Sequence, residues 1–328
     1  MRLIGILNRD GGTFRTIDIP AFVQRSAATF ERHGHVFEAR IVSGSELLDA
    51  LERAAADPAA DVILAGGGDG TISAAAGVCF RAGKPLAVLP AGTMNFFAQS
   101  LRVPPGLDEA VAAIAAGRLF EVDIATANDR PFIYQFSVGI HARLVRIREE
   151  MQYRNRWQKM WASIRAVAGA VSKPLKFQVV VSTPQGPQQR VASGVVVSNN
   201  LLAEGHLPFA DRIADGVLGV YIAKPMSKWD LIKLFVRVLI GRWKAHPRVS
   251  EHEVTSVTLT FPRRKRGARA VIDGELIPLA ERVELRIHPR QLRVFAPAAL
   301  AAALAPEPGA TQAEGPAPAT ARDPDAMV

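Results

Sequence analysis

The chain has 328 residues, 48% of them hydrophobic, which is enough for more than one packed core and excludes a wholly disordered protein. Its formal net charge of +9 favours an anionic partner, such as a nucleotide, a nucleic acid or an acidic membrane surface. The single cysteine, Cys79, excludes an intramolecular disulfide, and its apolar neighbours predict an inert core thiol.

The first 120 residues alternate between strand and helix patterns. Pro20 and Gly34 stand where a first helix would begin and stop. Such alternation is typical of a parallel sheet covered on both faces, so we predict a Rossmann-like α/β nucleotide-binding domain over residues 1–122. The expected strands are 2–7, 36–42, 61–65 and 86–89, and the expected helices are 20–32, 45–56, 71–81 and 107–116.

After residue 120, runs rich in β-branched and aromatic residues alternate with turn residues, which predicts a second, mostly antiparallel β domain over 123–296. Helical patterns at 143–171 and 227–243 interrupt it. Residues 297–328 are rich in Ala and Pro, which predicts a disordered tail after a short helix near 298–304. The expected strands are 132–138, 177–182, 191–198, 217–222, 254–261 and 283–287.

A glycine-rich turn follows the strand 61–65 and opens a helix: Gly66-Gly67-Gly68-Asp69-Gly70-Thr71. Glycines let the backbone come close to a ligand, and the N–H groups that open the helix attract an anion. The turn is not a Walker A loop, because no Gly-Lys-Ser/Thr ends it. We interpret it as a phosphate site rather than a plain tight turn.

A second turn, Pro90-Ala91-Gly92-Thr93-Met94-Asn95, follows the next strand. Ligands of open α/β sheets bind at the carboxyl ends of the strands, so the two turns are expected to share one cleft. A plain loop remains an alternative for this second turn.

These motifs occur in an order that resembles the diacylglycerol kinase and sphingosine kinase type lipid kinases, and most closely their bacterial soluble branch. The resemblance covers about residues 2–296 and implies a nucleotide-binding α/β domain and a C-terminal β-sandwich with the active site between them. The motifs are Gly67–Thr71, Pro90–Asn95, Ser137–Gly139 with Ala142, Ala214–Gly216 and Asp273-Gly274-Glu275.

The resemblance also implies roles for individual residues. Asp273 is expected to be the general base, and Asp69 to help organise Mg²⁺ near the phosphates. Asp215 would bind a structural Mg²⁺ through its side chain, beside the backbone carbonyls of Arg212 and Val217. The residues expected to hold ATP are Asn8, Gly67, Gly68, Asp69, Gly70, Thr71, Ile72, Ser73, Ala74, Thr93 and Glu275.

Two residues depart from the family pattern. Ala74 stands where the family usually has Glu, and Phe96 where it often has a second Asp. The missing carboxylates affect metal geometry and rate, and a catalytically impaired nucleotide- or lipid-binding regulator is therefore an alternative.

Asp273-Gly274 and Asp215-Gly216 have a plain alternative as well, because Asp-Gly is a favoured hairpin turn. An NAD kinase-like enzyme is a further alternative, since that family shares the Gly-Gly-Asp-Gly turn and the two-domain plan.

Membrane contact is expected through two basic stretches, 143–171 and 227–243, which carry Trp157, Trp161 and Trp229. Packing of their apolar faces on the β domain is the alternative. No apolar run approaches the ~18 residues of a membrane span, so we expect a cytoplasmic protein that binds membranes peripherally. No nucleic-acid-binding motif is present. The sequence leaves the lipid acceptor and a homodimer open.

Overall fold

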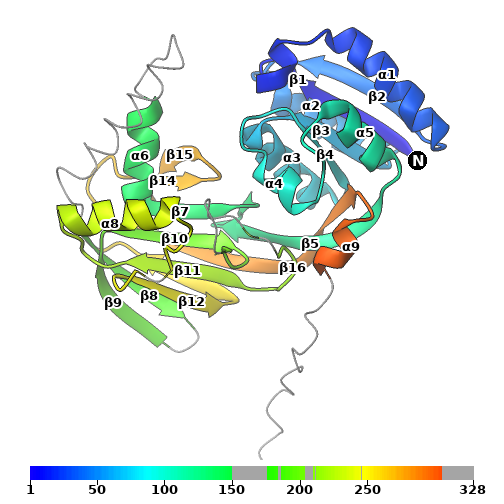
Figure 1. Ribbon diagram of the computed structural model, residues 1–328. Helices are drawn as coiled ribbons and strands as arrows, with labels where there is room; N and C mark the ends of the chain where they lie inside the picture. The colour runs from blue at the N-terminus through cyan, green and yellow to red at the C-terminus, as the bar shows by residue number, and fades with distance from the viewer. Residues whose placement is uncertain (150–175, 184–185, 204–209, 211, 245, 305–328) are drawn as a thin grey trace, which may run out of the picture.

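The computed structural model describes residues 1–149, 176–183, 186–203, 210, 212–244 and 246–304 (Figure 1). The N-terminal half is built on four parallel strands in the order β2-β1-β3-β4. The inner residues of β1, β3 and β4 are buried, as expected for strands covered on both faces. Helices α1 and α5 pack together, as do α2 and α3. The predicted α/β class is confirmed.

The elements of this half follow the predicted order closely. They are β1 (Arg2–Asn8), η1 (Gly12–Arg15), α1 (Ile19–Arg32), β2 (Val36–Val42), α2 (Leu47–Ala56), β3 (Val62–Gly67), α3 (Asp69–Ala82), β4 (Leu86–Pro90), α4 (Phe96–Ser100), α5 (Leu107–Ala115) and β5 (Arg118–Ala127).

The C-terminal half is a sandwich of two antiparallel layers around one apolar core. One layer is a six-stranded sheet in the order β12-β11-β10-β7-β14-β15, and the other is β16-β13-β8-β9, with β5 beside β16 and β6 beside β5. The predicted β-sandwich is confirmed. Its elements are β6 (Arg130–Phe132), β7 (Gln135–Gly139), α6 (Ile140–Glu149), β8 (Phe177–Thr183), β9 (Gly186–Ala192), β10 (Gly194–Asn199), β11 (Leu218–Ala223), α8 (Lys228–Leu239), β12 (Val249–Val254), β13 (Ser256–Thr260), β14 (Arg269–Ile272), β15 (Glu275–Pro278), β16 (Arg282–Ala296) and α9 (Leu300–Leu304).

Three predicted strands are each divided between two strands in the structure. The run 132–138 breaks at Ile133 and Tyr134, between β6 and β7. The run 191–198 breaks at Ser193, between β9 in one layer and β10 in the other, and the run 254–261 breaks at Thr255, between β12 and β13. At all three places the chain passes from one layer of the sandwich to the other. A composition pattern does not report such a corner.

β16 joins the two halves of the molecule. Its end pairs with the parallel sheet, with Val294 opposite Leu86, and its length pairs with β5. Leu292, Val294 and Phe295 are buried in the N-terminal core. The predicted boundary at 122/123 falls inside β5, and the largest sheet is continuous across both halves.

The remaining expectations fall as follows. The helix expected at 227–243 is α8, and the short helix near 298–304 is α9. Of the stretch 143–171, α6 covers the part up to Glu149, and 150–171 lie outside the described residues. Cys79 is fully buried, and burial raises the pKa of its thiol to about 12. No helix within the described residues is long and apolar enough to span a membrane.

Candidate active site

The two glycine turns meet at the carboxyl ends of β3 and β4. The Ala91 N–H donates to the Gly67 carbonyl at 2.9 Å. A Cβ added to Gly92 would lie 2.6 Å from the Gly68 Cα, so the turns pass so closely that position 92 has no room for a side chain. The structure thus brings the two predicted turns into one site, and Thr93 is exposed beside it.

The loop after β1 completes this edge. Asn8 donates from Nδ2 to the Thr71 Oγ1 at 3.0 Å and accepts the Asp10 N–H at 3.0 Å. A Cβ on Gly12 would lie 2.5 Å from the Ala91 carbonyl oxygen. Three strand ends therefore contribute to one backbone surface, with Asn8 linking the first to the second.

Helix α3 begins at the glycine-rich turn Gly66–Thr71 without a side-chain cap. Gly68 is its N-cap residue, and no side chain bonds to the first N–H groups. Uncapped N–H groups together with the helix dipole suit an anion such as a phosphate. Ile72 is buried in the core, so it supports the turn from behind rather than lining it.

Asp69 is engaged by the second turn. Its carboxylate accepts the N–H groups of Asn95 at 3.1 Å and Phe96 at 2.9 Å, and the hydroxyl of Tyr134 at 2.8 Å. Both oxygens therefore hold protein donors, and Asp69 caps the N-terminus of α4. Its predicted part in Mg²⁺ binding stays a prediction.

The two departures from the family pattern are apolar packing positions. Ala74 packs against the N-terminal core. The Phe96 ring lies 6.1 Å from the Tyr134 ring in an edge arrangement. Two positions that could have carried carboxylates therefore support the site without adding charge.

Asp273 lies in the two-residue turn between β14 and β15, where Asp273 and Gly274 have φ of +46° and +86°. Both central residues with positive φ form the tight hairpin turn that Asp-Gly favours. The turn aims the carboxylate back at the protein. Its Oδ1 accepts the N–H groups of Tyr134 and Gln135 at 2.9 and 3.0 Å.

The other oxygen of Asp273 reaches the N-terminal half. Oδ2 accepts the Ile133 N–H at 2.9 Å and the Ser73 hydroxyl at 2.6 Å. Burial raises the pKa of this carboxyl above its usual value, and the four hydrogen bonds oppose that rise because they favour the ionised form. Ser73 stands on α3, so the expected base contacts the helix that begins at the glycine-rich turn.

Tyr134 connects the two carboxylates, and the sequence carried no signal for it. Its N–H holds Asp273, while its hydroxyl donates to Asp69 and accepts the Phe97 N–H. Burial, with the charge of Asp69, raises the pKa of Tyr134 well above its usual value, so the phenol stays neutral. Glu275, by contrast, is largely exposed and pairs with Arg130.

The three residues expected to hold a structural Mg²⁺ lie in one loop before β11. Oxygen donors suit Mg²⁺, yet the Asp215 carboxylate is paired with the Arg212 guanidinium at 2.9 Å. The Val217 carbonyl already accepts the Asn200 N–H at 3.0 Å. Within the described residues, no group of three or more His, Cys, Asp or Glu side chains gathers as a metal site. As arranged, the Asp215 carboxylate is held by Arg212, and the predicted Mg²⁺ site stays a prediction.

Asp123 anchors the same loop and was missed from the sequence. It is fully buried, and its carboxylate accepts the N–H groups of Gly216 at 2.6 Å and Arg290 at 2.8 Å. Burial raises the pKa of this carboxyl. A lone Asp within the apolar run Val122–Ala125 was the available signal.

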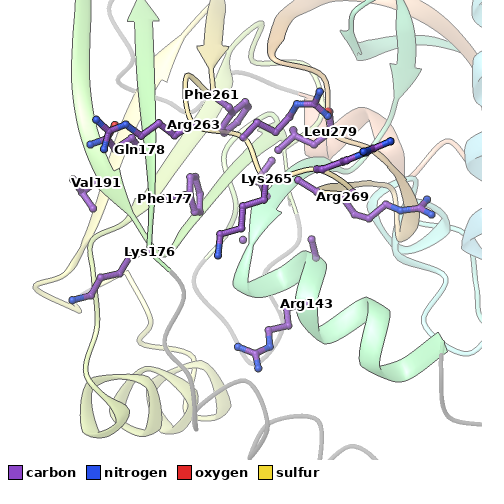
Figure 2. A pocket seen from close by; sticks show the side chains of 17 residues that line it. Arg143, Lys176, Phe177, Gln178, Val191, Phe261, Arg263, Lys265, Arg269 and Leu279 are labelled. Carbon is purple, nitrogen blue, oxygen red and sulfur yellow. The ribbon is translucent and has the colours of Figure 1, made fainter.

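A cavity of about 780 Å³ opens on the C-terminal half (Figure 2). Its lining is largely apolar and includes Phe177, Phe261 and Leu279. Charged residues of one sign surround these: Arg143, Lys176, Arg263, Arg264, Lys265, Arg266 and Arg269. Four of these are consecutive in the sequence, Arg263-Arg264-Lys265-Arg266, so a basic run borders an apolar cavity.

Two family models match the chain. Residues 2–127 match the diacylglycerol kinase catalytic domain, and residues 135–296 match the YegS C-terminal NAD kinase beta sandwich-like domain.

Curated relatives match over parts of their length. An uncharacterized protein of Synechocystis sp. is 26% identical over 248 residues, which cover 72% of this chain and 54% of the relative. A protein of Cronobacter sakazakii named "Probable lipid kinase YegS-like" is 30% identical over 141 residues, which cover 40% of this chain and 47% of the relative. The chain thus spans about half the length of these relatives.

Solved structures show the same fold. A crystal structure from Bacillus anthracis named as a diacylglycerol kinase superposes with a TM-score of 0.68 at 16% identity, covering 91% of this chain and 98% of that one.

Proposed function

Because this chain belongs to the lipid kinase family that joins a diacylglycerol kinase catalytic domain to a YegS-type C-terminal domain, we propose that it transfers the γ-phosphate of ATP to a hydroxyl of a membrane lipid. One observation carries the proposal. The Ser73–Asp273 hydrogen bond links the helix of the phosphate turn to a carboxylate from the other half of the molecule.

The nucleotide end of the reaction depends on backbone groups. ATP, as its Mg²⁺ complex, would lie with its phosphates against the Gly67–Gly70 turn and the uncapped start of α3. Peptide N–H groups there stabilise the charge that develops on the transferring phosphoryl group. When bound, Mg²⁺ adds positive charge at the β- and γ-phosphates.

The acceptor end needs a base. The lipid oxygen attacks the γ-phosphorus, the bond to the bridging β-phosphate oxygen breaks, and the lipid proton must leave as the new bond forms. Asp273 is the carboxylate that contacts α3, the helix beginning at the Gly67–Gly70 turn, so we assign it as the base that takes this proton. Its raised pKa makes it a stronger base. It also limits activity in acid, because a carboxyl that is already protonated cannot take the proton of the lipid hydroxyl.

The apolar cavity supports a lipid acceptor. The apolar lining, which includes Phe177, Phe261 and Leu279, suits an acyl chain better than the polar groups of a dinucleotide. Its rim is basic, which suits the surface of an anionic membrane.

Helix α8 supports contact with that membrane. Trp229, Lys233, Val236 and Ile240 are exposed and recur at i, i+4, i+7 and i+11, so they share one face, while Leu231 is buried. Trp229 is 74% exposed, which packing on the β domain does not explain. We propose that this stripe enters the interface of an anionic bilayer.

An NAD kinase-like activity is the second candidate, because the C-terminal family model carries an NAD kinase-like description. Purified protein would be incubated with [γ-³²P]ATP and either mixed diacylglycerol and phosphatidylglycerol vesicles or NAD. We expect label in the lipid fraction, and Asp273→Asn to remove it. Label in NAD alone would favour the second candidate. Label in neither fraction would favour a binding protein that has lost catalysis.

A further inference from the structure

The Asp273 carboxylate has no free position at which to receive a proton. An ionised carboxylate offers about four lone-pair sites, and here four donors fill them: the N–H groups of Ile133, Tyr134 and Gln135 and the hydroxyl of Ser73. A base must use one of these positions during the reaction.

Three of the four donors are fixed. They are consecutive peptide N–H groups at the entry to β7, a strand hydrogen-bonded on both sides within its sheet. The Ser73 hydroxyl is different, because its hydrogen turns about the Cβ–Oγ bond. Ser73 therefore holds the one position at which a proton can move.

Ser73 also lies on the side of the phosphates. It stands one helical turn beyond Asp69, and side chains of an α-helix tilt toward its N-terminus, which here is the uncapped end at Gly68. Its Oγ donates to Asp273 and accepts no hydrogen bond within the described residues, so a lone pair remains for an incoming hydroxyl.

We propose that Ser73 relays the proton between the acceptor hydroxyl and Asp273. As the lipid oxygen bonds to the γ-phosphorus, its proton passes to the Ser73 Oγ while the Ser73 proton passes to the Asp273 Oδ2. The bond to the β-phosphate oxygen breaks and its electron pair leaves with ADP. The inference rests on the proposed function. It adds Ser73 to the catalytic residues, because alanine at this position has no hydroxyl to carry the proton.

The test compares Ser73→Ala with the conservative Ser73→Thr. In the vesicle assay, Ser73→Ala is expected to lower kcat roughly 10²-fold with ATP binding retained, while Ser73→Thr stays within a few-fold of the wild type. Adding Ser73→Ala to Asp273→Asn should cost nothing more, because both act on one proton. A Ser73→Ala enzyme with wild-type kcat would overturn the relay, since the acceptor would then reach Asp273 directly.

A pH profile tests the Ser73–Asp273 hydrogen bond on which the relay depends, independently of the size of kcat. The Ser73 hydrogen bond favours ionised Asp273, so its loss raises the pKa of Asp273 and shifts the acid limb of kcat to higher pH. The neighbouring groups are neutral Tyr134, Asp69 behind it, and the exposed ion pair between Glu275 of β15 and Arg130 of β6. An acid limb that stays in place contradicts the proposal.

The contact can be judged without lipid turnover. Infrared titration of the Asp273 carboxyl, identified by its loss in Asp273→Asn, should show the same upward shift in Ser73→Ala. If the wild type phosphorylates neither lipid nor NAD, the proposed function fails, and the relay is judged on slow ATP hydrolysis, where water replaces the lipid hydroxyl. An unchanged carboxyl titration overturns the inference in either case.

Discussion

At Asp273, the turn and the base interpretations are compatible. The hairpin requires positive φ at position 273, and that conformation directs the carboxylate toward Ser73 and the 133–135 N–H groups. A residue can therefore be chosen for the turn and still carry the chemistry, and turn statistics alone do not separate the two.

Asp273→Asn is predicted to lower phosphoryl transfer about 10²-fold or more while ATP still binds. Asn adopts the positive φ readily. If its Nδ2 takes the place of Oδ2 beside the Ser73 hydroxyl, however, Nδ2 also faces the Ile133 N–H, and two donors then oppose each other. A buried donor without a partner costs about 1–3 kcal/mol, so the free energy of unfolding should fall by that amount. Urea unfolding beside the kinetic assay separates the two effects. Full activity would refute the base assignment.

Gly68→Val is predicted to abolish ATP binding without unfolding the protein. At Gly68 the φ is −85°, which any residue adopts, and an added Cβ meets the Gly92 Cα at an ordinary 3.5 Å. The valine methyl groups, however, would occupy the surface left for phosphates. Nucleotide affinity should drop at least about tenfold by calorimetry, with the melting temperature nearly unchanged.

Gly77→Ala is the matched control for Gly68→Val. Gly77 lies in the same helix, away from the turn, and an added Cβ finds only contacts of 3.6 Å or more. It should leave nucleotide affinity intact and gain roughly 0.5–1 kcal/mol of stability from helix propensity. Wild-type affinity in folded Gly68→Val would remove the turn from the nucleotide site.

Among the elements, α8 gives the most direct test of membrane binding. Trp229→Ser should weaken binding to phosphatidylglycerol vesicles about tenfold or more, because burying a large apolar side chain is worth about 1.5–3 kcal/mol. Leu48→Ser is the control, since Leu48 on α2 is also exposed, at 49%. Wild-type binding should exceed that to neutral vesicles and fall with salt. Vesicle sedimentation measures the affinity of each variant and its dependence on salt. An equal loss of affinity in the two variants would refute membrane binding through the exposed face of α8.

The loop at Arg212 to Val217 yields a test of the predicted Mg²⁺ site. Because the Arg212 guanidinium pairs with Asp215, Mg²⁺ should raise the melting temperature of Arg212→Gln more than that of the wild type. Asp215→Ala should show no such response at the same Mg²⁺ concentrations. A strong response in the wild type that Asp215→Ala removes would instead support the sequence-based site, with Arg212 displaced by the ion.

For the whole molecule, β16 decides whether the halves are independent. Leu292, Val294, Phe295 and Leu300 fill the core of the N-terminal half, and Val294 pairs beside β4. A fragment of residues 1–127, the extent of the catalytic family match, lacks all four. We predict that it shows no cooperative unfolding by circular dichroism, whereas residues 1–304 unfold in a sharp transition. Cooperative melting of the fragment would show that the N-terminal core closes without β16.

The sequence by itself determined the fold class, both turns and the motif order, because periodicity, glycines and strand ends are local features. It placed Asp273 and Ser73 in the site without joining them, since they lie 200 residues apart in the chain.

Only the tertiary structure decided that Ser73 contacts Asp273 and that Tyr134 bonds to both Asp69 and Asp273. It alone also decided that Arg212 forms an ion pair with Asp215. The same holds for the corners at Ser193 and Thr255, and for β16, which crosses from one core to the other. These features depend on which surfaces are buried against each other, and a hydrogen bond between distant residues leaves no trace in the spacing of either.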